Sequence, residues 1–452
     1  MTAPWRLHRD LLSNAGSLVA STGVASLLGA IYWIFAARLF DQRSVGYGSA
    51  AVSAMTLLGT IGMLGLGTLL IGELPRRRAR AGLVSAALLT SGLGALVIGL
   101  GFSVVSPRVS VNFATMIGTS GRSALFAAGV AVTSVTLVFD QATIGLMRGG
   151  IQLGRNMTFA LLKVLVLPAA AVALHDQAGV GITASWVAGL VLSLAAVAIG
   201  LRLRGEPVLA RPDWGVLRGL GKIAMAHNWL NLAMTMPFYL LPVLVTVVIS
   251  PAANAAFYIA VMLTTFLFIV PAHLSTVLFA VVAADPGAIA RKLRFALRLS
   301  FLIGIPGMVV LILGAHLALS LFGKGYTEAT VPMWLITLGY PAAVPKSLYI
   351  AVSRAAGRIP RAAIVLTVCS SLELAAAAAG GAAGGLYGLS LALLAVRYAE
   401  ALVTIPPVLR AALGCGRHSL TQSSADVHGE RRGRKPDAAV PYLETGLDVH
   451  EP

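Results

Sequence analysis

Long apolar runs alternate with short polar linkers along almost the whole chain. A membrane-spanning helix needs ~20 apolar residues, because it crosses ~30 Å of hydrocarbon at ~1.5 Å per residue. Runs of this length predict spans at residues 14–38, 44–72, 82–105, 124–146, 153–174, 180–201, 223–249, 253–282, 297–321, 329–352, 361–380 and 385–409. The pattern therefore predicts an all-α polytopic membrane protein with about twelve transmembrane helices.

Composition excludes the main alternative. A chain of 452 residues is long enough for three soluble domains, but 57% of its residues are hydrophobic and only 11% are charged. The mean hydropathy is +0.85. The first apolar run is too long for the core of a cleaved signal peptide, so we interpret it as the first span.

The positive charges are sorted by side of the membrane. The net charge is +17, and 26 of the 34 Lys and Arg residues fall in linkers on one side of the predicted spans. The positive-inside rule then predicts a multi-pass protein of the bacterial inner membrane with both termini in the cytoplasm. The excess of basic residues is explained by the membrane topology and by contact with anionic lipids. We therefore expect no nucleic-acid partner.

The spans fall into two sets of six around a basic linker with two prolines. We predict four parts: an N-terminal lobe at 1–201, a cytoplasmic linker at 202–222, a C-terminal lobe at 223–413 and a disordered tail at 414–452.

The two halves show weak similarity. A shift of 210 residues aligns Tyr47 with Phe257 and Leu57 with Leu267, at the starts of the second and eighth spans. Such agreement is common by chance between apolar segments. Together with six spans in each half, it predicts a parallel pseudo-repeat around a central cavity.

Polar residues and prolines in the spans mark candidates for cargo contact and bending. Pro237 and Pro242 interrupt the seventh span and are hinge candidates, because each proline removes a backbone donor. Asn228 in the same span and Asn14 in the first are polar candidates for the cavity lining. Ordinary helix kinks and tight helix packing are the alternatives.

Six ionisable residues lie at membrane depth, where charge is costly and is usually functional. They are Asp140, Lys163, Lys346, Glu373, Arg397 and Glu400. One interpretation is a set of structural ion pairs: Glu373 with Arg397 at equal depth, Arg397 with Glu400 one turn apart, and Asp140 with Lys163 on consecutive spans.

The other interpretation is functional. Lys163, Lys346 and Arg397 would contact an anionic substrate, and Arg38 would either join them or extend to the headgroups. The acids Asp140, Glu373 and Glu400 would then be candidates for binding a coupling proton or cation.

Signatures of enzymes are absent from the sequence. It contains no phosphate-binding Gly-Lys-Ser/Thr loop, and its eight histidines form no ligand cluster. The two cysteines, Cys369 and Cys415, are too far apart along the predicted topology to form a metal site. We therefore expect no enzyme activity, no cofactor and no metal.

The chain resembles the polysaccharide-biosynthesis flippases of the multidrug/oligosaccharidyl-lipid/polysaccharide exporter superfamily over most of residues 11–412. The resemblance rests on a small and polar first span, on the segment that starts at Tyr239, and on four local features: Ala37–Phe40, Val45-Gly46, Gly59–Gly67 and Glu73–Arg76. It implies two six-helix lobes, alternating access and a polyprenyl-pyrophosphate-linked oligosaccharide as cargo.

The chain departs from that pattern in having few cationic cavity residues, which leaves a different glycolipid or a less charged cargo open. The alternatives are a cation-coupled small-molecule exporter of the multidrug type and a non-catalytic scaffold of an envelope-polysaccharide complex. A membrane-embedded glycosyltransferase would need catalytic acids on a sizeable outer loop, which the sequence lacks. We expect a monomer, with other polysaccharide-synthesis membrane proteins as candidate partners.

Overall fold

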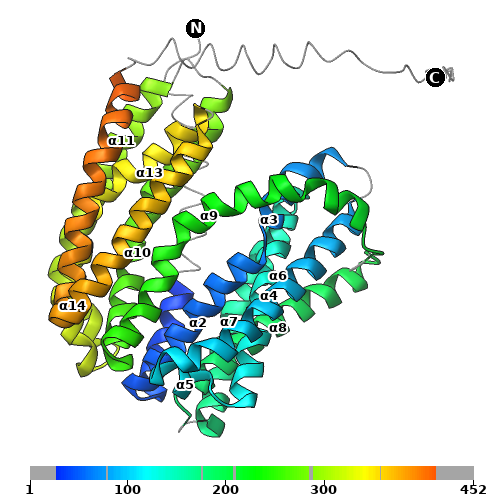
Figure 1. Cartoon of the computed structure of the whole chain (residues 1–452), viewed down its shortest axis with the longest axis horizontal. Coiled ribbons are helices and arrows are strands. Elements are labelled where there is room, and N and C mark those ends of the chain that lie inside the picture. Colours follow the sequence, from blue (N-terminus) through cyan, green and yellow to red (C-terminus); the bar gives the residue numbers. More distant parts are fainter. Residues whose placement is uncertain are drawn as a thin grey trace, which may run out of the picture.

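The computed structural model describes residues 27–77, 80–174, 177–206, 210–284, 289–356 and 358–413. Within these residues the chain is helical and forms no strand (Figure 1). The first half contains the helix Leu27–Leu39, α2 (Gln42–Gly62), α3 (Leu66–Glu73), η1 (Leu74–Arg76), α4 (Ala81–Val109), α5 (Val111–Ile117), α6 (Ser120–Gly145), α7 (Gly149–Leu174) and α8 (Val180–Leu203). The second half contains α9 (Trp214–Val248), α10 (Pro251–Ala284), α11 (Ile289–Ser320), η3 (Lys324–Ala329), α12 (Thr330–Leu338), α13 (Tyr340–Ala355) and α14 (Ile359–Leu413).

The prediction of an all-α membrane fold is confirmed. In the described part of the chain, nine helices are long and apolar enough to cross a membrane. A tenth span is added if the bent pair Lys324–Leu338 and Tyr340–Arg354 counts as one. Each predicted span falls on helical residues where the structure describes it. The last two spans lie in α14, and Leu27–Leu39 is the described end of the first.

Two predicted spans are not single helices. The span predicted at 44–72 is interrupted after α2, where Leu64 and Gly65 have positive φ angles of 52° and 73°. The span predicted at 329–352 bends by 47° around Gly339. Apolar content shows that a segment can cross the bilayer, but not whether its backbone stays continuous.

The last two spans turn back on each other at Gly384 and Gly385, where the backbone leaves the helical region. A Cβ atom on Gly380 would lie 2.4 Å from the Gly388 carbonyl oxygen, so the two arms pack backbone to backbone. Glycine is needed here for close approach and, at Gly385, for a φ of 57°. The turn lies at the boundary between the spans predicted at 361–380 and 385–409.

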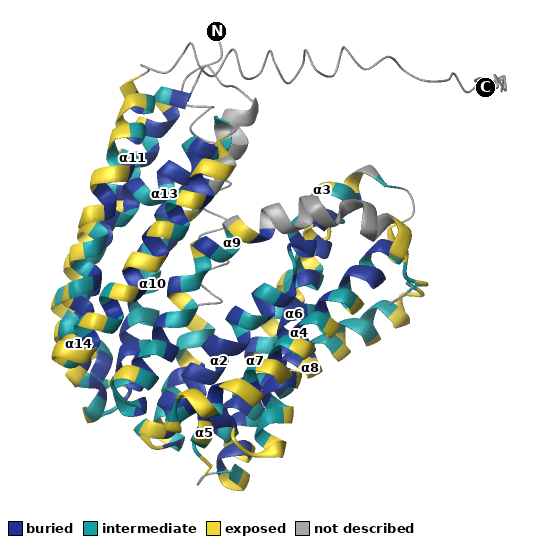
Figure 2. Ribbon diagram, in the orientation of Figure 1, coloured by how far each residue is buried: buried dark blue, intermediate teal, exposed yellow. Residues whose placement is uncertain are grey.

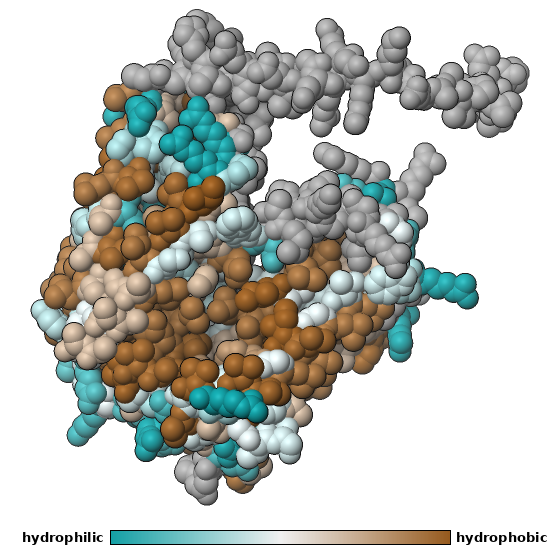
Figure 3. Space-filling model, viewed as in Figure 1, coloured by the Kyte–Doolittle hydropathy of each residue, from teal (hydrophilic) through white to brown (hydrophobic). Residues whose placement is uncertain are grey.

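Exposed apolar residues follow one face of the outer helices. On α4, Leu93, Val97, Leu100 and Val104 are 46–69% exposed and recur at helical spacing. Apolar residues cover most of the surface drawn in Figure 3, and the exposed positions in Figure 2 lie on the outer sides of the helices. A soluble protein rarely exposes so much contiguous apolar surface, so this face fits hydrocarbon.

The two halves meet where α2 and α10 begin. The Asn254 amide nitrogen on α10 donates to the Gly46 carbonyl oxygen (2.9 Å) and to Ser49 Oγ (3.0 Å) on α2. A Cβ atom on Gly46 would lie 1.7 Å from the Pro251 carbonyl oxygen. The two backbones therefore touch, which only glycine permits.

Further hydrogen bonds join the halves at this same end. Gln42 Nε2 donates to the carbonyl oxygens of Ala252 (3.1 Å) and Gly325 (3.2 Å). Toward the other end the two groups of helices diverge, and α9 crosses between them (Figure 1). On α9, Asn231 bonds Thr68 of α3, and Trp229 bonds Thr367 of α14, both at 2.9 Å. The halves are thus in direct contact at one end and are linked by α9 at the other.

Replacing Gly46 with Ala will destabilise the protein, because the added methyl group overlaps the Pro251 backbone. Overpacking a tight helix contact costs about 1–3 kcal/mol. Thermal unfolding in detergent will show a lower midpoint for Gly46→Ala. Gly29→Ala is the matched control, since a Cβ atom there meets nothing within 4 Å. An unchanged midpoint for Gly46→Ala would show that the two halves are not held by this close contact.

Candidate functional site

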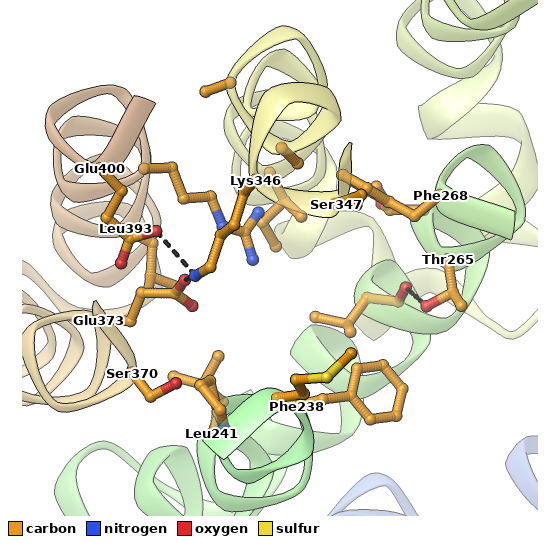
Figure 4. Close-up of a pocket in the computed structure, with 18 of the residues that line it drawn as sticks. Phe238, Leu241, Thr265, Phe268, Lys346, Ser347, Ser370, Glu373, Leu393 and Glu400 are labelled. Carbon is orange, nitrogen blue, oxygen red and sulfur yellow. Dashed lines mark hydrogen bonds and ion pairs between the residues drawn. The ribbon is translucent and has the colours of Figure 1, made fainter. Parts of the chain in front are cut away.

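Three charged side chains form a buried cluster in the second half of the chain. Lys346 Nζ donates to Glu373 Oε1 at 2.7 Å and to Glu400 Oε2 at 2.8 Å (Figure 4). The carboxylates are almost enclosed, with side-chain exposures of 6% and 3%, whereas Lys346 is 21% exposed. The ammonium group of Lys346 is therefore the more exposed part of the cluster and separates the two carboxylates from the surrounding space.

The turn at Gly384 and Gly385 brings the two glutamates together. Glu373 lies on the first arm of α14 and Glu400 on the second, so the hairpin aligns residues that are 27 positions apart. Lys346 enters from α13, whose direction is set by the bend at Gly339. The cluster therefore depends on the two backbone breaks in this half.

The cluster forms one wall of a cavity of about 300 Å³. Lys346, Glu373, Arg397 and Glu400 supply the charged wall from α13 and α14. Figure 4 shows Phe238 and Leu241 of α9 across the cavity from them, with Thr265 and Phe268 of α10 on a further side. The remaining lining residues are largely apolar: Ala233, Met234, Pro237, Phe257, Val261, Thr264, Ile336, Ala342, Ala343, Ser347, Ile350, Leu366, Ser370 and Leu393.

Arg397 lines the same cavity but forms no ion pair within the described residues. It lies beside the helix break, where a Cβ atom on Gly339 would be 3.3 Å from its Nη1. It is close enough to Glu373 to interact electrostatically. One interpretation of the sequence paired Arg397 with Glu373 or Glu400. In the structure both carboxylates bind Lys346 instead, which enters from α13 after the bend at Gly339.

The charges of this wall balance when both acids are ionised, since two cations face two carboxylates. Glu400 Oε1 is buried and has no hydrogen-bond partner among the described residues. A buried carboxylate oxygen without a donor is costly, and a proton or a bound cation would satisfy it. Of the three acids expected to bind a coupling ion, Glu373 and Glu400 line this cavity and Asp140 does not.

Lys163 lies in the other half, inside a box of aromatic rings. Its Nζ is 4.2 Å from the centre of the Trp186 ring, 4.7 Å from Phe159 and 4.8 Å from Tyr32. No acidic side chain in the described ranges pairs with it. Cation–π attraction partly offsets the loss of hydration in such a site.

The expected pair of Asp140 with Lys163 was wrong. Asp140 forms a two-pronged ion pair with Arg155, at 2.8 Å to Nε and 2.7 Å to Nη2. Arg155 lies near the start of the span predicted at 153–174 and was counted with the basic linker residues rather than at membrane depth, yet its side chain is only 3% exposed. A signal was present: Asp140 lies five residues before the end of α6, and Arg155 lies six after the start of α7. Residues at such offsets lie at similar depth on antiparallel helices.

The other candidate residues lie elsewhere. Arg38 is exposed and donates to the Leu321 carbonyl oxygen (2.8 Å), so it is outside the cavity where a substrate contact was expected. Asn228 is buried in α9 but is not among the lining residues, and Asn14 lies outside the described residues. Pro237 and Pro242 lie inside α9, and Pro237 lines the cavity. Their hinge role stays a prediction.

No family model and no curated protein matches the sequence. Solved structures do match. An inward-facing multidrug resistance MATE family transporter of the MOP superfamily superposes with a TM-score of 0.67 at 14% identity, covering 86% of this chain and 95% of that one. The chain shares its fold with this transporter.

Two further structures share this fold. The outward-facing form of a MATE family transporter has a TM-score of 0.57 at 14% identity, covering 89% of this chain and 95% of that one. The lipid II flippase MurJ in an inward closed conformation has a TM-score of 0.61 at 14% identity, covering 90% and 92%. The fold of this chain is thus similar both to multidrug transporters and to a lipid flippase.

Replacing Lys346 with Met will destabilise the protein by about 3 kcal/mol, because two buried carboxylates lose their shared cation. Thermal unfolding will report the loss as a lower midpoint. The double variant Lys346→Met/Glu400→Gln will recover much of it, since one carboxylate, Glu373, then remains beside one cation, Arg397. Lys324→Met, at an exposed lysine, serves as the control. Wild-type stability in Lys346→Met would mean that this ion-pair cluster is not formed in the membrane.

Proposed function

We propose that this protein is a flippase of the bacterial inner membrane that moves a lipid-linked glycan precursor from the cytoplasmic to the outer leaflet. This shared fold supports a transporter rather than an enzyme, because the similar structures are transporters and a lipid flippase. Alternating access would move the cargo between the leaflets, and no chemical step on the cargo is required.

The observation that carries this proposal is the amphipathic cavity of the second half. One wall presents Arg397 and Lys346, and the facing wall is aromatic and aliphatic. A pyrophosphate headgroup needs fixed cations to replace its hydration, and a polyprenyl chain needs apolar surface. Arg397 is the first contact for the phosphates, since the described structure gives it no carboxylate partner.

The orientation follows from charge and shape together. The two halves diverge at the end where α8 stops and α9 starts (Figure 1). That end carries arginines of the basic linkers, among them Arg202, Arg204 and Arg211. The positive-inside rule assigns it to the cytoplasm, so the described state would be inward-facing. The higher TM-score with the inward-facing than with the outward-facing transporter agrees with this.

Glu373 and Glu400 would couple transport to an ion. Lys346 donates to one oxygen of each carboxylate, and the unpartnered Oε1 of Glu400 would be the acceptor for a proton or a monovalent cation. Binding of that ion would weaken the ion pairs of Lys346 with the two glutamates and change the net charge of the cavity wall. The ion gradient would then bias which side the cavity faces.

The unpartnered Oε1 of Glu400 also favours a second function. A cation-coupled exporter of small molecules would use Glu400 and Glu373 to bind a cationic amphiphile against the aromatic wall. In this case Arg397 would repel the substrate. The charge of the transported molecule therefore separates the two functions.

Purified protein in liposomes will flip a fluorescent polyprenyl-pyrophosphate oligosaccharide, and Arg397→Gln will reduce the rate at least about tenfold through loss of a charged phosphate contact. Arg397→Lys will retain part of the rate, because the positive charge remains. Loss of label accessible to a membrane-impermeant quencher gives the rate under an imposed proton or sodium gradient.

Arg298→Gln is the matched control for this assay, since Arg298 is exposed on α11 and does not line the cavity. A parallel assay measures uptake of a fluorescent cationic dye into the same liposomes. Dye transport without lipid flipping, increased by Arg397→Gln, would replace the flippase with the exporter. Neither activity, with folded protein and a matched lipid, would support the scaffold.

A further inference from the structure

A second charged groove lies outside the candidate transport cavity, between the start of α7 and the end of α8. It has a volume of about 650 Å³ and is lined by Arg148, Gly150, Ile151, Gly154, Arg155, Val197, Gly200, Leu201, Arg204 and Glu206. Glu206 is paired with Arg148, and Arg155 is paired with Asp140. Three arginines against these two carboxylates leave the groove with net positive charge.

Arg155 forms the base of the groove and has unused binding capacity. Its side chain is 3% exposed, and its Nη1 has no hydrogen-bond partner among the described residues. An unpaired guanidinium nitrogen at this burial is costly unless an acceptor is supplied. The bond to Asp140 holds the guanidinium plane in place, so the remaining N–H groups have a fixed direction.

The N-terminus of α7 adds donors at the same place. This helix of 26 residues begins at Gly149, and the first N–H groups of a helix have no partner within it. The Ile151 N–H donates to the Arg148 carbonyl oxygen (2.9 Å), so the donors in question are those of the other first-turn residues. Cβ atoms on Gly150, Gly154 or Gly200 would meet nothing within 4 Å, so the glycines keep the groove open. The groove thus combines arginines, a helix N-terminus and free space, which together suit a phosphate group.

The surroundings indicate a lipid as the source of that phosphate. Leu153 and Met157 of α7 and Ile199 and Leu203 of α8 are 40–83% exposed beside the groove. These apolar side chains lie next to the arginines of the groove. A lipid whose headgroup binds the arginines would therefore place its acyl chains against them. Inorganic phosphate would use the arginines but gain nothing from this apolar surface.

We propose that this groove binds the headgroup of an anionic phospholipid, with the phosphate on Arg204, Arg148 and the start of α7 above Arg155. The site lies in the first half of the chain, whereas the cavity assigned to the cargo lies in the second. The lipid is therefore a bound component of the protein rather than the transported molecule. Its binding is independent of which cargo is carried.

The test measures binding of phosphatidylglycerol to detergent-solubilised protein by native mass spectrometry, with phosphatidylcholine as the zwitterionic comparison. Arg204→Gln will weaken the tightest phosphatidylglycerol binding about fivefold, as expected for one basic contact. Arg202→Gln is the matched control, because Arg202 is exposed on the same helix end and does not line the groove. It will change binding less than about twofold.

A steric variant tests the same site without altering charge. Gly154→Leu will fill the groove and weaken phosphatidylglycerol binding, whereas Gly314→Leu on α11 will not, although both positions have free space for a Cβ atom. Equal effects of Arg204→Gln and Arg202→Gln would overturn the proposal in favour of general surface attraction. Displacement of the lipid by millimolar inorganic phosphate would overturn it in favour of a soluble anion.

Discussion

The contact between α2 and α10 is the constraint on which the rest of the structure depends. Gly46 has no side chain, so its backbone touches the Pro251 carbonyl, and the Asn254 amide satisfies the Gly46 carbonyl from the opposite helix. The same contact region includes a buried cluster that joins the halves, with Trp33 on one side and Ile259 and Phe322 on the other. Away from this region the two groups of helices diverge, and α9 crosses between them (Figure 1).

The contact between α2 and α10 also explains why a weak repeat was visible in the sequence. The shift of 210 residues aligns Gln42 with Ala252, and the Gln42 amide binds the Ala252 carbonyl oxygen across the interface. Residues that the shift aligns thus lie next to each other at this contact, as a repeat around a central axis would require, and the repeat itself stays a prediction. The aligned Tyr47 and Phe257 are both buried just beyond this contact. The similarity between the starts of α2 and α10 could arise by chance in apolar segments. In the structure these two similar segments are in contact.

Apolar periodicity and glycine spacing predicted the helices and the turn at Gly384, because both depend on local physics. The partners within the buried ion pairs were not predicted correctly. Depth alone paired Glu373 with Arg397, whereas Lys346 reaches Glu373 and Glu400 through a bend at Gly339 that apolar content does not encode. Asp140 was assigned to Lys163 because Arg155 was counted as a linker residue. Counting from both helix ends would have found the Arg155 pair, but nothing in the sequence reveals the aromatic box around Lys163.

The two halves treat a buried lysine in opposite ways. Lys346 is held by two carboxylates beside a cavity, while Lys163 is surrounded by the rings of Tyr32, Phe159 and Trp186. The second half therefore holds its buried lysine through two ion pairs, and neutralising either acid would remove one of them. The first half holds its buried lysine through ring faces alone, and its buried Asp140 is paired with Arg155 instead.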